Sequence, residues 1–409
     1  MLGAAGLHPI SHAADGTEVE RATQCNVENR AIDIREYVIG TPLPHLKVTI
    51  RIFYNNGHPF VSVQDSCHAR KTSRNQLFTG AKGLVIGKFI MVFAHLLQFA
   101  MNLLSPLFHR DVLNVDRQND RAATRLFSAA ALHQHLELFP HRPALSAYLF
   151  VFGELIDAWQ NRSIPHIERI QMVLRARFFL MAWQAFVEAH PAYSVNVQFI
   201  SRESFNIFRT VCDSLISLVL IHRRHYPHYP LLPWLHSTEG IEHVFGLLRQ
   251  LKKDFTYIDM LYFEPKMRVL MRGSFDTLTA DQQLNQTAAG YLHTYFMAPD
   301  LDLPALAHWP TDNEIMQAAA LAFDEAAELL SVLGVDCKKI LEGYQDPPPP
   351  KPKSRRSVIA APRGPQTLAE LISLYQYDPR AKLSSHTENE LEACKAALVA
   401  DHIDCTLEM

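Results

Sequence analysis

The chain lacks the sequence signals of several common protein classes. It has 409 residues and six cysteines, and no two of the cysteines form a C-x-x-C pair. A zinc ribbon or a disulfide framework is therefore not indicated, and a reducing compartment is the simpler interpretation. Residues 1–16 lack the basic start and apolar stretch of a secretory signal peptide. The sequence also contains no P-loop, no G-x-G-x-x-G loop and no G-x-S-x-G elbow.

An excess of charge of either sign is absent as well. The chain has 39 basic and 42 acidic residues, so its net charge is −3. No global positive field indicates nucleic acid, and any DNA binding must come from a local patch. Hydrophobic residues make up 48% of the chain and charged residues 20%, which is typical of a globular protein.

The most apolar run, 84–104, is long enough to raise the question of a membrane span. It contains four side chains that are costly in hydrocarbon, namely Lys88, His95, Gln98 and Asn102. We therefore predict a buried core helix over this run and no membrane partner.

The distribution of apolar residues predicts an α+β fold, mainly α with a small β-sheet. Residues 47–52 alternate between polar and apolar, as in a half-buried strand, and 60–64 form a second short strand beyond a turn at 55–57. A further strand is expected near 31–39, whereas residues 1–30 show no clear period. From 84 to 226 the chain has the pattern of successive helices with prolines near the joints.

The segment that follows the 60–64 strand has a carboxylate and a basic face. Asp65 ends the strand, and a helix after it would place His68, Lys71 and Asn75 on one side with Arg74 beside them. A carboxylate on a rigid strand end can hold a divalent metal, and a basic face next to it suits phosphate groups. The alternative is a strand-to-helix turn in which Asp65 is an N-cap and the basic side chains are solvated.

A second segment with paired carboxylates begins near residue 237. Ser237 or Thr238 is a suitable N-cap for an amphipathic helix, which places Glu239, Glu242 and Arg249 opposite its apolar stripe. Two carboxylates one turn apart repel each other unless a cation joins them. The alternative is that both are solvated near the helix N-terminus, where the helix dipole favours them.

Taken in order, these segments resemble the P-element and THAP-domain family of DNA transposases. Asp65, His68, Lys71, Arg74 and Asn75 match the family's D-x-x-H-x-x-K-x-x-R-N segment. The resemblance spans about 60–262, and the other similar segments are 123–128, 156–162, 199–205 and 237–249.

The resemblance implies an RNase H-like core interrupted by a helical insertion and followed by C-terminal helices. It implies that Asp65 and Glu242 are the second and third acids of a catalytic Mg²⁺ or Mn²⁺ site. Three residues stand where the family contacts a guanine nucleotide such as GTP: Asp157, Gln160 and Glu239. DNA is the implied partner, with phosphate contacts expected from His68, Lys71, Arg74, Asn75 and Arg249.

The family's first catalytic aspartate should lie well upstream of Asp65. Asp33 is the nearest candidate that the pattern offers, but only 32 residues separate the two positions (65 − 33). Three strands, a helix and their turns need roughly 40–50 residues. We therefore expect an N-terminally truncated, incomplete core with severely impaired catalysis, and no zinc-bearing DNA-binding module.

Three functional hypotheses follow. The chain is a transposase-derived protein with a degenerate metal-dependent DNA cleavage and transfer core, or a non-enzymatic DNA-binding or protein-interaction module with the same fold, or an unrelated helical scaffold or membrane-associated protein. The basic residues of the proline-rich linker suit a nuclear location, with the cytoplasm as alternative, and the chain is compatible with oligomerisation. The expected organisation is an undefined segment 1–45, a partial core at 46–83 and 230–262, an insertion at 84–229, helices at 263–343, a basic linker at 344–366 and a helical tail at 367–409.

Overall fold

The computed structural model describes residues 7–78, 83–113, 116–276, 287–288, 291–292 and 301–344. These residues are mainly helical and include a small mixed sheet, so the predicted α+β class is confirmed. Apart from Tyr344, the expected basic linker and the helical tail lie outside the described residues, as does the nuclear localisation patch within that linker.

The main sheet has four strands. Their order across the sheet is β1 (Ser11–Ala14), β4 (His58–Gln64), β3 (Lys47–Asn55) and β2 (Asp33–Gly40). The β1 strand runs parallel to β4, whereas β4 pairs antiparallel with β3, and β3 pairs antiparallel with β2. The strands expected at 31–39, 47–52 and 60–64 are therefore confirmed, and β1 is an addition to them.

A tight turn joins β3 to β4. Asn56 has φ 50° and Gly57 has φ 81°. Positive φ at both central residues defines the type I′ turn, whose twist matches that of a β-hairpin. The Asn-Gly signal in the sequence thus sets the pairing of Asn55 with His58.

The N-terminal segment is more regular than its sequence suggests. After β1, helix α1 (Glu18–Glu28) begins with a capping box: Thr17 accepts a hydrogen bond from the backbone of Glu20, whose carboxylate accepts one from the backbone of Thr17. Such reciprocal capping fixes where a helix starts even when its apolar periodicity is weak. The expectation that 1–30 has no regular structure is therefore wrong for the described part of this segment.

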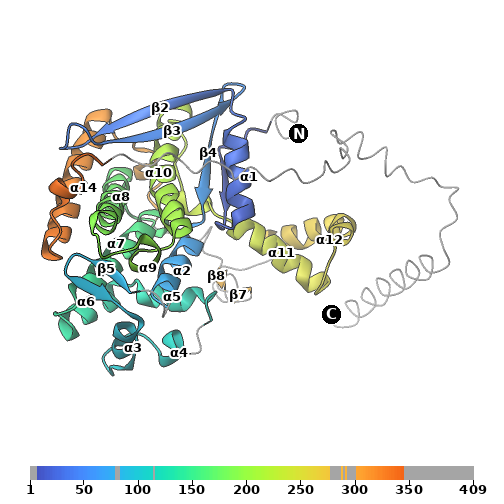
Figure 1. Cartoon of the computed structure of the whole chain (residues 1–409). Helices are drawn as coiled ribbons and strands as arrows, with labels where there is room; N and C mark the ends of the chain where they lie inside the picture. The colour runs from blue at the N-terminus through green and yellow to red at the C-terminus, as the bar shows by residue number, and fades with distance from the viewer. Residues whose placement is uncertain are drawn as a thin grey trace, which may run out of the picture. The chain divides into compact units, whose positions relative to one another are not determined.

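Three long helices form the core below the sheet (Figure 1). They are α7 (Pro143–Gln160), α8 (His166–Ala189) and α10 (Arg202–His225). Helix α10 packs on β3 and β4 and on α8, and α7 packs on α8. Large side chains such as Trp159, Trp183 and Phe208 are at most 1% exposed. Burial of this apolar surface is the main stabilising contribution to such a core.

Among the described helices, α10 alone is long and apolar enough to cross a membrane. Within its most apolar 18-residue window, 78% of the residues are buried inside the protein.

The apolar run at 84–104 is not one helix, contrary to expectation. It forms a hairpin of β5 (Leu84–Ile86) and β6 (Phe89–Met91), followed by helix α3 (Phe93–Met101). The turn between the strands uses Gly87 with φ 59°, a conformation that favours glycine. Trp183 of α8 donates a hydrogen bond to the Val85 carbonyl at 2.6 Å, which ties the hairpin to the core.

The other described elements are mostly helices. Helix α12 crosses the predicted boundary at 262, so the expected core and C-terminal region are not separated there. The remaining bounds are α2 Ser66–Gln76, α4 His109–Val112, α5 Asp120–Leu126, α6 Ala129–Leu138, α9 Val195–Gln198, η2 Pro233–Leu235, α11 Glu239–Leu251, α12 Tyr257–Asp276, β7 Thr287–Ala288, β8 Tyr291–Leu292, η3 Ala305–Ala307, α14 Asp312–Val332 and α15 Cys337–Ile340.

Candidate metal centre

Asp65 lies where β4 ends and α2 begins. Its Oδ1 accepts a hydrogen bond from the backbone N–H of His68 at 2.9 Å, which makes it the N-cap of α2. Asp65 is only 2% exposed. The capping role that the sequence offered as an alternative is therefore real, but it does not describe the whole environment of this carboxylate.

A second aspartate lies beside it. Asp15 follows β1, and because β1 and β4 are parallel neighbours, their carboxyl ends meet at the same edge of the sheet. The backbone N–H of Asp65 donates to the Ala14 carbonyl at 2.9 Å, which locks the two strand ends together. The next residue, Gly16, has φ 89°, and a Cβ there would lie 2.7 Å from Ile207. The chain turns away tightly at this point and leaves the Asp15 side chain at the edge.

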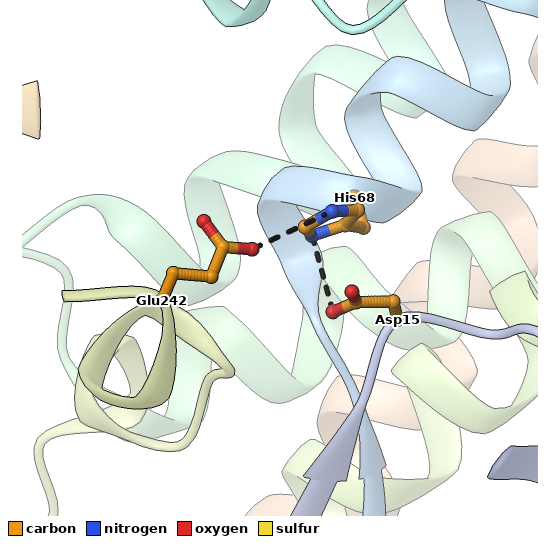
Figure 2. Close-up of side chains that lie close together, drawn as sticks. All are labelled: Asp15, His68 and Glu242. Carbon is orange, nitrogen blue, oxygen red and sulfur yellow. Dashed lines mark ion pairs between the residues drawn. The ribbon is translucent and has the colours of Figure 1, made fainter. Parts of the chain in front are cut away.

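Glu242 approaches the same point from helix α11. The imidazole of His68 lies between the acids: Nδ1 is 3.4 Å from Asp15 Oδ1 and 3.5 Å from Asp65 Oδ1, and Nε2 is 3.6 Å from Glu242 Oε1. Figure 2 shows His68 between Asp15 and Glu242, each from a different element. One ligand atom from each of these three residues lies within 4.8 Å of the others.

Thr238, which precedes α11, connects the two aspartates. Its backbone N–H donates to Asp65 Oδ2 at 2.8 Å, and its hydroxyl lies 2.6 Å from Asp15 Oδ1 and 3.1 Å from Asp65 Oδ2. Thr238 does not use its side chain to cap α11. The predicted N-cap residue therefore holds the start of α11 against the sheet edge instead.

The cluster is strongly polarised. Burial alone would raise the pKa of Asp65, but the imidazole and backbone N–H of His68 and the N–H of Thr238 lower it to about 2. Burial raises the pKa of Asp15, although Thr238 and His68 oppose that shift. Burial acts to lower the pKa of His68, and the nearby Asp65 and Asp15 carboxylates raise it overall. Negative charge is therefore concentrated around one imidazole.

The donor set suits a divalent cation. Ligands of one ion at about 2.1 Å lie at most about 4.2 Å apart. The three ligand atoms within 4.8 Å would need to move by less than about 1 Å. Carboxylate oxygens favour Mg²⁺ or Mn²⁺, and an imidazole nitrogen among them favours Mn²⁺ over Mg²⁺. The side chains of Asp15, His68 and Glu242 are 32%, 21% and 28% exposed, so solvent reaches the cluster.

The residues expected at a guanine nucleotide lie around the first turns of α2. Gln160 donates a hydrogen bond to the Ser66 hydroxyl at 2.6 Å. Burial raises the pKa of Asp157, and the charge of Arg70 opposes it. Glu239 begins α11, and its charge acts on Cys67. The three residues therefore lie near the first turns of α2, and of them Gln160 has a hydrogen bond to that helix.

The basic face of α2 points into the protein, which differs from the expectation. Arg74 is 1% exposed and donates to the carbonyls of Asp111 at 2.8 Å and Asp116 at 3.1 Å. Lys71 is 5% exposed, and its ammonium lies 3.4 Å from Asp120. Asn75 donates to the Arg117 carbonyl at 3.3 Å.

Arg74 cannot contact a DNA phosphate from this position, and that expectation is wrong. Its guanidinium is surrounded by protein, donates to two backbone carbonyls and lies 5.0 Å over the ring of Phe78. His68 is placed among the carboxylates, so the geometry favours metal contact over phosphate contact. Arg249, near the end of α11, is exposed.

Asp33 is excluded as a partner of Asp65. It begins β2, where it pairs with Tyr54 of β3, which in turn pairs with Pro59 at the start of β4. Asp33 therefore lies at the opposite end of the sheet from Asp65 and contacts Arg35 instead, at 3.1 Å.

Asp15 is the residue that the sequence interpretation missed. Its signal was a short run, 10–14, followed by Asp15-Gly16 and the Thr17-x-x-Glu20 capping pattern. A strand, a turn and a helix start in direct succession place an acid at a strand's carboxyl end.

No protein-family model, no curated protein and no solved structure matches this chain.

Proposed function

We propose that this chain is a transposase-derived protein whose RNase H-like core binds a divalent metal and cleaves or joins DNA strands. One observation carries the proposal: acids from three distant segments, Asp15, Asp65 and Glu242, converge on the imidazole of His68. Thr238 and Asp65 are 173 residues apart in sequence, and their hydrogen bond joins the segment before the helical region to the segment after it. The resemblance to P-element transposases supports the proposal because that family places a helical insertion between its second and third acids.

Each residue has a distinct part in the proposed site. Asp15, Glu242 and His68 supply ligand atoms, and Asp65 orients His68 while contributing negative charge. Thr238 positions both aspartates. A divalent ion held by these residues would supply Lewis acidity and would activate water for attack on a phosphodiester. Arg249 lies exposed on the same helix as Glu242 and offers positive charge for the DNA backbone.

Asp15 changes the expectation of impaired catalysis. That expectation rested on the lack of the first of the family's three acids, since Asp33 lies too close in sequence to Asp65. With Asp15 beside Asp65, the cluster has three carboxylates and an imidazole. We therefore propose that metal binding is retained and that strand cleavage is the activity to test.

A second candidate function is a DNA-binding or protein-interaction module that uses no metal. The observation that favours it is the way protein donors occupy Asp65: His68 N–H on Oδ1 and Thr238 N–H on Oδ2. A carboxylate whose two oxygens are both satisfied by protein donors is stable without an ion. This arrangement would preserve the fold after catalysis is lost.

Metal titration and a nicking assay separate the two functions. Manganese binding is measured by calorimetry, and nicking is followed on supercoiled plasmid with and without Mn²⁺ or Mg²⁺. The metal-dependent function predicts binding and nicking that Asp15→Asn and Glu242→Gln abolish. The matched control is Asp33→Asn, which removes an exposed carboxylate at the far end of the sheet. DNA binding without manganese binding or nicking would favour the second function.

A further inference from the structure

A cavity lined by basic side chains lies apart from the carboxylate cluster. It has a volume of about 330 Å³ and lies between the β5–β6 hairpin, α3 and the start of α7. Four of its eight lining residues are basic, and the other four are apolar: the basic ones are Lys88, His95, His141 and Arg142. Cavities that bind small molecules usually start near 300 Å³.

The positive charge in this cavity has no acidic partner within the described chain. Arg142 donates to the side-chain oxygen of Gln98 and lies 4.8 Å over the ring of Phe139, and both partners are neutral. None of the four basic residues forms an ion pair with a described carboxylate. Basic groups gathered without counter-charge repel one another, so they are costly unless an anion joins them.

Two buried nitrogen atoms in the cavity lining lack a hydrogen-bond partner among the described residues. They are Nδ1 of His95 and Nη1 of Arg142. Buried polar atoms in proteins nearly always have partners, so the residues that line this cavity have hydrogen-bonding capacity that the described protein groups leave unused. Burial lowers the pKa of His95, and the charges of Arg142 and His141 lower it further, as expected for uncompensated positive charge.

The backbone around the cavity is rigidly held. Helix α7 begins at Pro143 with Arg142 as N-cap and without a side-chain cap, so the positive end of its dipole adjoins the cavity. Lys88 follows Gly87 at the hairpin tip, and its backbone N–H donates to the Leu333 carbonyl at 3.0 Å. The aliphatic carbons of the Lys88 side chain lie close to Gly334, where an added Cβ would be 3.1 Å from them. The backbone that carries Lys88 and Arg142 is thus fixed by contacts within the protein.

We propose that this cavity is a binding site for a phosphate group, carried either by a free phosphorylated compound or by a DNA backbone. Arginine, lysine and histidine side chains beside a helix N-terminus form a usual donor set for phosphate. The inference does not depend on the proposed metal centre. The cavity adjoins the start of α7, whereas Gln160 at its end contacts α2 beside the acids, about 25 Å away at 1.5 Å per residue.

The test measures phosphate binding by the full chain. Pyrophosphate binding is followed by calorimetry at low ionic strength, and binding of a short DNA duplex by fluorescence anisotropy. Arg142→Gln and Lys88→Gln should each weaken pyrophosphate binding about tenfold or more, because each removes a charge-assisted contact. The matched control is Arg110→Gln, which removes an exposed arginine of α4 outside the cavity lining.

The two sources of phosphate give different patterns. A DNA backbone is the ligand if the variants weaken duplex binding and pyrophosphate competes with the duplex. A free phosphorylated compound is the ligand if only pyrophosphate binding weakens. The proposal is overturned if the native chain binds neither probe, or if Arg110→Gln weakens binding as much as the two cavity variants. Thermal unfolding of each variant shows whether it is folded, and Lys88→Gln leaves the start of α7 intact if Arg142→Gln does not fold.

Discussion

The hydroxyl of Thr238 lies 2.6 Å from Oδ1 of Asp15, and 223 residues of chain separate the two. The same hydroxyl lies 3.1 Å from Oδ2 of Asp65. A hydroxyl has one proton, so it can donate to only one carboxylate at a time. The shorter distance indicates that Asp15 receives it, while the backbone N–H of Thr238 serves Asp65. The start of α11 is therefore hydrogen-bonded to the ends of β1 and β4. Glu242 lies one helical turn further along α11.

Replacing Thr238 by valine tests this fastening. Thr238→Val removes the hydroxyl and keeps the shape, so the free energy of unfolding should fall by about 1–2 kcal/mol. The affinity for Mn²⁺ should fall as well, because Glu242 is no longer held in place. Urea unfolding and calorimetry measure the two effects. Thr238→Ser keeps the hydroxyl and should behave like the native chain, and equal losses in both variants would contradict the role of the hydrogen bond.

Metal binding should stabilise the native chain. At a hundred times the dissociation constant, a ligand that binds only the folded state adds about 2.7 kcal/mol. We expect Mn²⁺ to raise the unfolding midpoint of the native chain and of Asp33→Asn, but not of Asp15→Asn or Glu242→Gln. Thermal unfolding with and without Mn²⁺ measures this. If Mn²⁺ raises the unfolding midpoint of Asp15→Asn as much as that of the native chain, Asp15 is not a ligand.

Local patterns in the sequence predicted the elements with strong periodicity. The Lys47–Asn55 strand, the Asn56-Gly57 turn and the α11 helix follow from alternation, turn chemistry and amphipathic spacing. These signals depend on neighbouring residues alone, so one sequence is enough to read them. The four-residue strand β1 is too short for a period to show.

Tertiary pairing decided what the sequence could not. Asp15 becomes important only because β1 lies parallel to β4, a long-range pairing that no local pattern contains. Arg74 has the spacing of a surface residue beside Lys71, but it is buried and donates to the carbonyls of Asp111 in α4 and of Asp116. The sequence therefore indicated which residue types matter at 65–75, but not which of them face solvent.

Arg74 and Arg249 should respond differently to substitution. Arg74→Met leaves the buried carbonyl of Asp111 and the carbonyl of Asp116 without their charged donor, so the free energy of unfolding should fall by about 3 kcal/mol. Arg249→Gln alters an exposed residue and should leave stability within about 0.5 kcal/mol. If α11 faces DNA, Arg249→Gln should also reduce the slope of log affinity against log salt by about 1.

Urea unfolding and DNA binding across salt concentrations provide both measurements. The stability of Arg74→Met is the direct test of its burial. A stable Arg74→Met variant with a reduced salt slope would mean that Arg74 reaches the DNA after all.

Two buried histidines should make stability depend on pH. Burial, together with the charges of Arg142 and other neighbours, lowers the pKa of His135 to about 4. Burial and the charge of Arg169 lower the pKa of His166 to about 4, although its Nε2 donates to the Leu306 carbonyl at 2.8 Å. In the unfolded chain a histidine has a pKa near 6.5, so between about pH 6.5 and 4 the unfolded state binds more protons. Stability is then full above pH 6.5 and falls as the pH drops toward 4.

His166→Gln isolates one of these contributions. Between pH 7.5 and 4.5 each neutral buried histidine should cost the native chain about 2–3 kcal/mol of unfolding free energy. Glutamine does not titrate, so His166→Gln should lose less stability over that range by about this amount. The control is His133→Gln, because the His133 side chain is 74% exposed and this variant removes a histidine that is not buried. Urea unfolding at pH 7.5 and 4.5 measures the change in unfolding free energy of each variant. If the native chain and His166→Gln lose the same unfolding free energy over this range, His166 is protonated in the folded state at the lower pH.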